Sequence, residues 1–128
     1  MAPLIYLDTH VVAWLYATGA EALSPRAAEM IDRCDDLRIS PMVRLELQYL
    51  FEIGRVGEPA VTVVDALVGT MGLKVCDTSF AGVVHEAEKL TWTRDPFDRL
   101  IVAQARFNGA PLVTKDHTLH AHYVDAVW

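Results

Sequence analysis

Short apolar runs alternate along the chain with polar segments that carry helix-start signals. Leu4 to Leu7 is a nearly unbroken apolar run that ends at Asp8, which is the pattern of a strand covered on both faces. Further strands are predicted at residues 37–39, 73–76, 111–114 and 124–127. Strands this short and apolar are typical of a buried parallel sheet.

The segments between these runs predict helices. Thr9 is the predicted cap of a short helix, and Ser24-Pro25 and Ser40-Pro41 each indicate an N-cap followed by proline at the first helical position. One predicted helix covers about residues 11–17, a second begins at residue 25, and a third runs from residue 41 to Gly54. Further helices are predicted at about 59–70, 79–90 and 96–108. The last of these is capped by Asp95 and ends at Gly109. Alternating strands and helices imply right-handed crossovers and a mainly parallel sheet with helices on both faces.

Length and composition predict one domain over residues 1–128. The chain is 52% hydrophobic with a mean hydropathy of +0.22, which is ample for a core, and we see no repeat or linker. No segment approaches the roughly 20 apolar residues that span a bilayer, and the start MAPLIYLD lacks the basic region of a secretory signal. We therefore expect a cytoplasmic protein with no membrane association, in which Cys34 and Cys76 are reduced thiols.

The net charge of −6 argues against a protein that grips nucleic acid with a general basic surface. It does not exclude an enzyme that acts on nucleic acid. Acidic metal ligands count as negative in this sum, whereas the cations that they bind reverse the local charge where phosphate arrives.

Carboxylates from distant segments are predicted to meet at one edge of the sheet. Ligands of an open parallel sheet bind outside the carboxyl ends of its strands, and Asp8 and Asp116 each follow a predicted strand at that end. Asp98 is the third residue of its helix and shares a face with Ile101 and Val102, so it should point inward.

Glu46 interrupts an otherwise apolar stripe on the helix that begins at Pro41. Such a carboxylate should be at least half buried, and burying it ionised is costly unless it is paired or bound to metal. One alternative is an ion pair with Arg44, Arg99 or Arg106.

The aspartates also have ordinary structural explanations. Asp8, Asp95 and Asp116 are candidate caps of helices or turns, and Asp98 suits the helix dipole. These explanations do not say why acids from four segments share one rim, whereas a common hard cation does. Oxygen ligands without Cys or His favour Mg²⁺ or Mn²⁺ over zinc, and such a site fits phosphodiester hydrolysis by metal-activated water.

Four motifs carry a family resemblance: LDTH at 7–10, RLEL at 44–47, DPFDRLIVAQA at 95–105 and LVTKD at 112–116. In order and spacing, over essentially the whole chain, they resemble the PIN domain, especially the VapC-type toxins of VapBC toxin–antitoxin pairs. The resemblance implies a PIN-like three-layer α/β/α sandwich and a Mg²⁺- or Mn²⁺-dependent endoribonuclease. It also implies a homodimer and a cognate antitoxin that silences the enzyme.

The resemblance assigns roles by motif position. Asp8, Glu46 and Asp98 match the central metal-binding and catalytic acids, and Asp116 matches the fourth. Residues that position water or metal by hydrogen bonding are expected to be Thr9 and Thr114, with Asp95 as a cap or outer residue. Candidate RNA contacts are Arg44, Arg94, Arg99 and Lys115. Four aromatic side chains are compatible with partner contacts, although core packing or an ordinary surface position explains most of them more simply: Trp14, Tyr49, Phe51 and Trp92.

Other functions remain open at this point. A receiver-like domain would use Asp77, after a predicted strand, as phosphoryl acceptor and Lys115 as its phosphate lysine. A non-catalytic module with a PIN-like fold is a second alternative. His117, His120 and His122 are closely spaced in a predicted loop and suggest zinc, but no fourth ligand is evident, and His10 is a candidate for substrate contact or a surface role.

Overall fold

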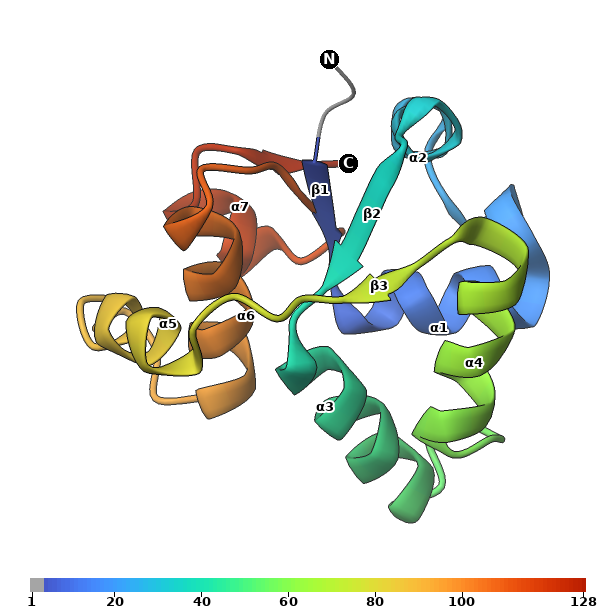
Figure 1. Ribbon diagram of the computed structural model, residues 1–128, viewed down its shortest axis with the longest axis horizontal. Coiled ribbons are helices and arrows are strands. Elements are labelled where there is room, and N and C mark those ends of the chain that lie inside the picture. The colour runs from blue at the N-terminus through green and yellow to red at the C-terminus, as the bar shows by residue number, and fades with distance from the viewer. Residues whose placement is uncertain (1–3) are drawn as a thin grey trace.

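The computed structural model describes residues 4–128, in which five parallel strands form one sheet with helices on both faces (Figure 1). The strands are β1 (Leu4–Leu7), β2 (Asp36–Ile39), β3 (Lys74–Val75), β4 (Leu112–Val113) and β5 (Ala126–Val127). Their order in the sheet is β3-β2-β1-β4-β5. The predicted α/β class with a mainly parallel sheet between helices is confirmed.

The helices form two layers, with α1, α2 and α4 on one side of the sheet and α5, α6 and α7 on the other (Figure 1). The helical elements are α1 (Thr9–Thr18), the 3₁₀ turn η1 (Gly19–Ala22), α2 (Pro25–Arg33), α3 (Pro41–Glu52), α4 (Ala60–Met71), α5 (Phe80–Ala87), α6 (Pro96–Phe107) and α7 (His117–His122). Helix α3 leaves the end of β2 and packs against α1, α4 and α6, so it joins the two layers. All helices between residues 4 and 128 are too short or too polar to cross a lipid bilayer.

The strand order reverses between β1 and β4, because the chain builds the sheet outward from β1 in one direction and then returns to its other side. Parallel sheets bind ligands at such a switch point, outside the carboxyl ends of the strands. The ladder here extends past β1, since the backbone N–H of Asp8 donates to the carbonyl of Val113 at 3.0 Å. Asp8 is therefore fixed at the switch point.

Two local predictions differ from the structure. Asp8, not Thr9, is the N-cap of α1, because its extended backbone ends β1 while its carboxylate accepts from the N–H of Thr9 at 2.8 Å. The segment after Asp116 is the helix α7, where only a turn and a loop were expected, because the Asp116 carboxylate caps the backbone N–H groups of Thr118 and Leu119. Ser24 and Ser40 are N-caps as predicted.

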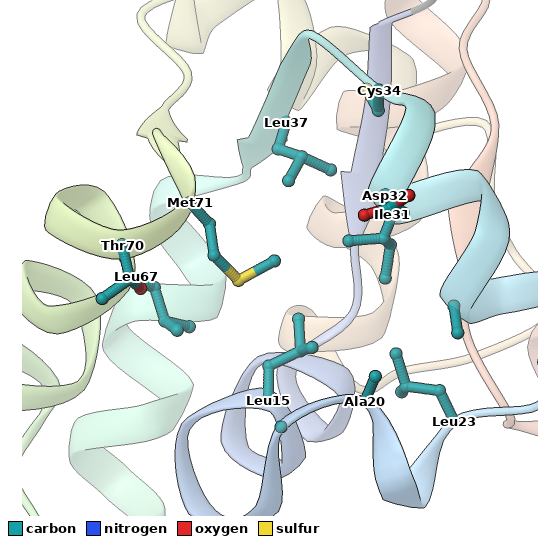
Figure 2. A pocket seen from close by; sticks show the side chains of 12 residues that line it. Leu15, Ala20, Leu23, Ile31, Asp32, Cys34, Leu37, Leu67, Thr70 and Met71 are labelled. Carbon is teal, nitrogen blue, oxygen red and sulfur yellow. The ribbon is translucent and has the colours of Figure 1, made fainter.

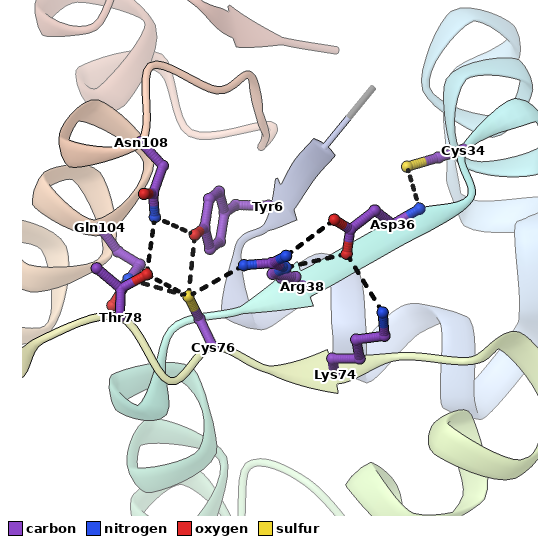
Figure 3. A network of polar contacts seen from close by, with 9 residues as sticks. All are labelled: Tyr6, Cys34, Asp36, Arg38, Lys74, Cys76, Thr78, Gln104 and Asn108. Carbon is purple, nitrogen blue, oxygen red and sulfur yellow. Dashed lines mark hydrogen bonds and ion pairs between the residues drawn. The ribbon is translucent and has the colours of Figure 1, made fainter. Parts of the chain in front are cut away.

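A polar network ties the α6 face of the sheet to the loop after β3 (Figure 3). Its centre is the buried thiol of Cys76, which lies 3.1 Å from the Tyr6 hydroxyl and accepts from Gln104 at 3.4 Å. Asn108 donates to the same hydroxyl at 2.6 Å, and Arg38 reaches the sulfur at 3.8 Å. No disulfide joins Cys76 to Cys34, in agreement with the sequence-based expectation.

Candidate active site

Asp8 is the most enclosed of the rim carboxylates, with only 7% of its surface exposed. One carboxylate oxygen accepts from the backbone N–H of Thr9, and the other accepts from the Thr114 hydroxyl at 2.6 Å. Burial raises the pKa of Asp8, while these two hydrogen bonds oppose the rise by favouring the charged form. These two hydrogen bonds therefore fix the position of the buried Asp8 carboxylate at the switch point and favour its ionised form.

Glu46 reaches the same rim from α3. Its carboxylate accepts a short hydrogen bond from the Thr9 hydroxyl, which is the partner that the sequence required and is not an arginine. Partial burial raises the pKa of Glu46, and the charge of Asp8 raises it further. Thr9 therefore connects the two acids, because its backbone N–H donates to Asp8 and its hydroxyl donates to Glu46.

Asp98, in the first turn of α6, shows how strongly the acids act on each other. Burial is the largest cause that raises its pKa from 3.8 to about 7, and the next causes are the charges of Asp95, Asp8, Asp116 and Glu46. A carboxyl group with such a pKa carries a proton about half of the time near neutral pH. The rim therefore concentrates negative charge, as a cation site would.

The outer acids Asp95 and Asp116 are both helix N-caps. Asp95 accepts from the backbone N–H groups of Phe97 and Asp98 at 2.8 and 3.3 Å, which matches the predicted cap. The Thr114 hydroxyl, which donates to Asp8, also accepts from the backbone N–H of Asp116 at 3.1 Å. Thr114 is fully buried, and its two hydrogen bonds connect the end of β4 to Asp8 and Asp116.

The chemistry of this donor set fits a hard divalent cation, since it consists of carboxylate oxygens whose charges oppose each other. In residues 4–128, however, no group of three or more His, Cys, Asp or Glu side chains is arranged to hold a metal ion. Both oxygens of Asp8 and one oxygen of Glu46 accept hydrogen bonds from threonine or backbone donors. Which acids bind metal stays a prediction.

The four predicted RNA contacts have different surroundings. The Arg99 guanidinium donates to the carbonyls of Ala87 at 3.1 Å and Glu88 at 3.4 Å, so it caps the end of α5. Arg94 donates to a backbone carbonyl of its own loop at 2.8 Å. Lys115 is exposed beside the rim, and Arg44 lines a shallow pocket between α3 and α4. Contact of these side chains with RNA stays a prediction.

Two of the three histidines near the end of the chain, His120 and His122, have separate partners. The His120 ring nitrogen lies 2.6 Å from the carbonyl of Thr114, and the His122 ring stacks on Trp92 with 4.6 Å between centroids. Together with the result that the described residues contain no metal-holding group, these contacts give no support to a zinc site.

The topology also disfavours the receiver-like alternative. Asp77 follows β3 at the edge of the sheet, whereas Lys115 follows β4, with β2 and β1 between them. Three strand spacings correspond to roughly 14 Å. An acceptor carboxylate and its phosphate lysine would need to lie much closer.

A cleft of about 290 Å³ opens beside the acids, lined by Asp8, His10, Trp14, Lys115, Asp116 and His117. The sequence analysis named His10 as a candidate for substrate contact and Trp14 as a candidate for partner contact or core packing, but it did not predict that both side chains line one cleft. The available signal was the four-residue spacing of His10 and Trp14, which places both rings on one face of α1 at 6.1 Å.

A larger cavity of about 500 Å³ lies elsewhere, between α1, α2 and α4 (Figure 2). Apolar side chains such as Leu15, Ile31, Leu67 and Met71 surround it, and the rim acids are absent from its lining. It therefore has the composition of a surface for apolar contacts and lacks the groups for phosphodiester chemistry.

The sequence matches the PIN domain family over residues 5–124. Because the match spans most of the chain, the chain belongs to the PIN domain family. A relative from Mycobacterium tuberculosis, named Ribonuclease VapC22, is 32% identical over 124 residues, which cover 92% of this chain and 91% of the relative. The resemblance to VapC-type proteins is thereby confirmed.

Solved structures support the same fold. A toxin–antitoxin complex from Klebsiella pneumoniae matches with a TM-score of 0.65 at 14% identity, covering 97% of this chain and 96% of that chain. VapBC2 from Rickettsia felis, bound to a DNA fragment from its promoter, matches with a TM-score of 0.64 at 19% identity and 92% of each chain. At such low identity these matches show the fold alone.

Proposed function

We propose that this chain is a divalent-metal-dependent endoribonuclease and the toxin component of a toxin–antitoxin pair. The observation that carries the proposal is the electrostatic coupling of Asp98 to the other acids: burial and then the charges of neighbouring acids, Asp8 and Glu46 among them, raise its pKa to about 7. The relative named as a ribonuclease supports RNA as the substrate. Mg²⁺ or Mn²⁺ suits the all-oxygen donor set best.

In this proposal Asp8, Glu46 and Asp98 hold the cation, with Asp116 at the outer side of the site. A bound cation lowers the pKa of water, neutralises phosphate charge and stabilises the leaving oxygen. The hydrogen bonds of Thr9 and Thr114 hold the carboxylates of Glu46 and Asp8 at the rim, and in this proposal both carboxylates would turn toward the cation when it binds. Near neutral pH Asp98 is protonated part of the time, because its pKa is about 7, and a cation bound beside it would favour the ionised carboxylate.

An antitoxin partner and a homodimer belong to the same proposal. The structural neighbours from Klebsiella pneumoniae and Salmonella typhimurium are a toxin–antitoxin complex and a DNA-bound VapBC complex. Light scattering of the purified chain at several concentrations measures the dimer, and co-purification with the product of an adjacent small gene measures the antitoxin contact. A protein that stays monomeric at all concentrations contradicts the dimer.

The test is cleavage of total RNA by the purified protein with Mg²⁺, with Mn²⁺ and with chelator. Asp98→Asn, prepared identically, exposes contaminating ribonuclease, and Asp65→Asn on the exposed side of α4 is the matched control. We expect metal-dependent fragments from wild type and Asp65→Asn and none from Asp98→Asn. Equal cleavage by Asp98→Asn would contradict the assignment, and absence of metal-dependent cleavage from every protein would favour the non-catalytic alternative.

A further inference from the structure

Aromatic and basic side chains form a wall along one side of the acidic cleft. The Trp14 and Trp128 rings meet edge to face with 5.8 Å between centroids. The Lys115 ammonium lies over both rings, 6.0 Å from the centroid of Trp14 and 5.8 Å from that of Trp128. His10 extends the wall on the α1 side. We call these four residues the aromatic wall.

The aromatic wall is continuous with the acids. Trp14, Lys115 and His10 line the same cleft as Asp8 and Asp116. Trp14 and His10 also line a second cavity of about 480 Å³, which lies between α1, α3 and the segment 55–58. A ligand whose phosphate reaches the acids therefore has the Trp14 ring beside it and space beyond.

Charge narrows the choice of ligand. The acids repel a phosphodiester, and among the described residues that line the cleft, Lys115 carries the one fixed positive charge. An ammonium held over indole faces at an exposed position is bound only weakly, so the Lys115 ammonium is free to move to a phosphate. A nucleobase then replaces it on the ring, because every base has a face that stacks on aromatic side chains.

Packing alone accounts for part of the aromatic wall, since Trp14 and Trp128 both contact the core. It does not account for the cation over both rings or for the opening of Trp14 onto two cavities. A nucleotide with its base on Trp14 and its phosphate on Lys115 accounts for both.

We infer that the aromatic wall is a subsite for one unpaired nucleotide of the RNA, next to the phosphate that is cut. Trp14 stacks on the base, Trp128 supports Trp14 edge-on, and Lys115 pairs with the phosphate. The inference rests on the proposed ribonuclease function and adds a preference for single-stranded RNA. Stacking does not distinguish bases strongly, so the subsite positions the strand more than it selects a sequence.

The experiment measures binding by fluorescence anisotropy in chelator, so that the RNA stays intact. The probes are a labelled single-stranded RNA octamer and an abasic ribose-phosphate octamer of equal charge. Wild type should prefer RNA, and Trp14→Leu should weaken RNA binding about 5- to 100-fold without weakening abasic binding. Trp14→Phe should restore most of the preference, and Phe107→Leu, an exposed aromatic at the far end of α6, is the matched control.

Lys115→Gln tests the phosphate contact at an exposed position, where folding is not at risk. It should weaken both probes equally and reduce the slope of log affinity against log salt by about 0.7. A folded Trp14→Leu protein that keeps the wild-type preference for RNA overturns the inference, as does an unchanged salt slope for Lys115→Gln. If one of these results is found while the wild-type protein cleaves RNA in Mg²⁺, the inference about the subsite is wrong and the proposed function stands. If the wild-type protein neither binds nor cleaves RNA, the proposed function is wrong as well.

Discussion

Replacing Asp98 with asparagine should stabilise the metal-free protein, and only above acidic pH. The folded state holds the pKa of Asp98 at about 7, against an ordinary value of 3.8. Between these values the native protein binds a proton that the unfolded chain has lost, so its stability falls as pH rises. Below about pH 4 both states are protonated and the mutation should have little effect.

The size of the effect follows from the two pKa values. A shift of the Asp98 pKa from 3.8 to about 7 lowers the free energy of unfolding by about 4 kcal/mol above pH 7. Because Asp98 keeps some contact with solvent, we expect about half of this, or about 2 kcal/mol. For a chain of this length that is a rise of about 7 °C in Tm for Asp98→Asn at pH 8.

The assay is urea unfolding of wild type, Asp98→Asn and the control Asp65→Asn from pH 4 to pH 9 in chelator. Between pH 4 and pH 7 the free energy of unfolding of wild type should fall relative to that of Asp98→Asn. Above pH 7 the difference between the two proteins should stay constant. Mg²⁺ at tenfold excess over its Kd should raise the free energy of unfolding of wild type by about 1.4 kcal/mol. The same Mg²⁺ concentration should raise the free energy of unfolding of Asp98→Asn by clearly less. A difference between the proteins that is constant across pH would refute the electrostatic reasoning.

Three further changes test the surroundings of the acids. Thr114→Val leaves one carboxylate oxygen and one backbone N–H without their partner, so it should cost about 1–3 kcal/mol in urea unfolding, and Thr114→Ser should restore most of it. Tyr6→Phe removes the hydroxyl to which Asn108 donates and should cost about 1–2 kcal/mol by the same measurement; unchanged stability would contradict this. Asp95→Asn keeps the cap but removes the largest charge effect on Asp98, so the pKa of Asp98, followed by NMR of its carboxyl carbon, should fall; an unchanged pKa would contradict this.

The strands and most helix starts were predictable because their signals are local. The run from Leu4 to Leu7 is apolar without interruption because helices cover both faces of β1, and Ser24 and Ser40 precede prolines at the first helical position. Helix α7 was missed because a six-residue helix with three histidines and one buried leucine shows no apolar periodicity. Its stability comes from the Asp116 cap and from tertiary contacts.

The site was predictable only in part. That Asp8 and Asp116 share a rim follows from parallel strands, but their adjacency depends on β4 pairing with β1, which no local pattern specifies. The sequence analysis expected Glu46 to pair with an arginine or bind a metal, and it did not predict the hydrogen bond from the Thr9 hydroxyl, which depends on the packing of α3 against α1. Trp128 joins Trp14 only through the β4–β5 pairing, so the aromatic wall has no sequence signature as a whole.

Three of the rim aspartates, Asp8, Asp95 and Asp116, also begin helices. Asparagine caps a helix about as well as aspartate, whereas alanine and valine do not. One base change converts an aspartate codon into any of these three. Asparagine variants at these positions should therefore lose activity and keep the stability of the fold, while alanine variants should also lose about 0.5–2 kcal/mol of stability. An alanine scan of the rim would confuse these two kinds of loss.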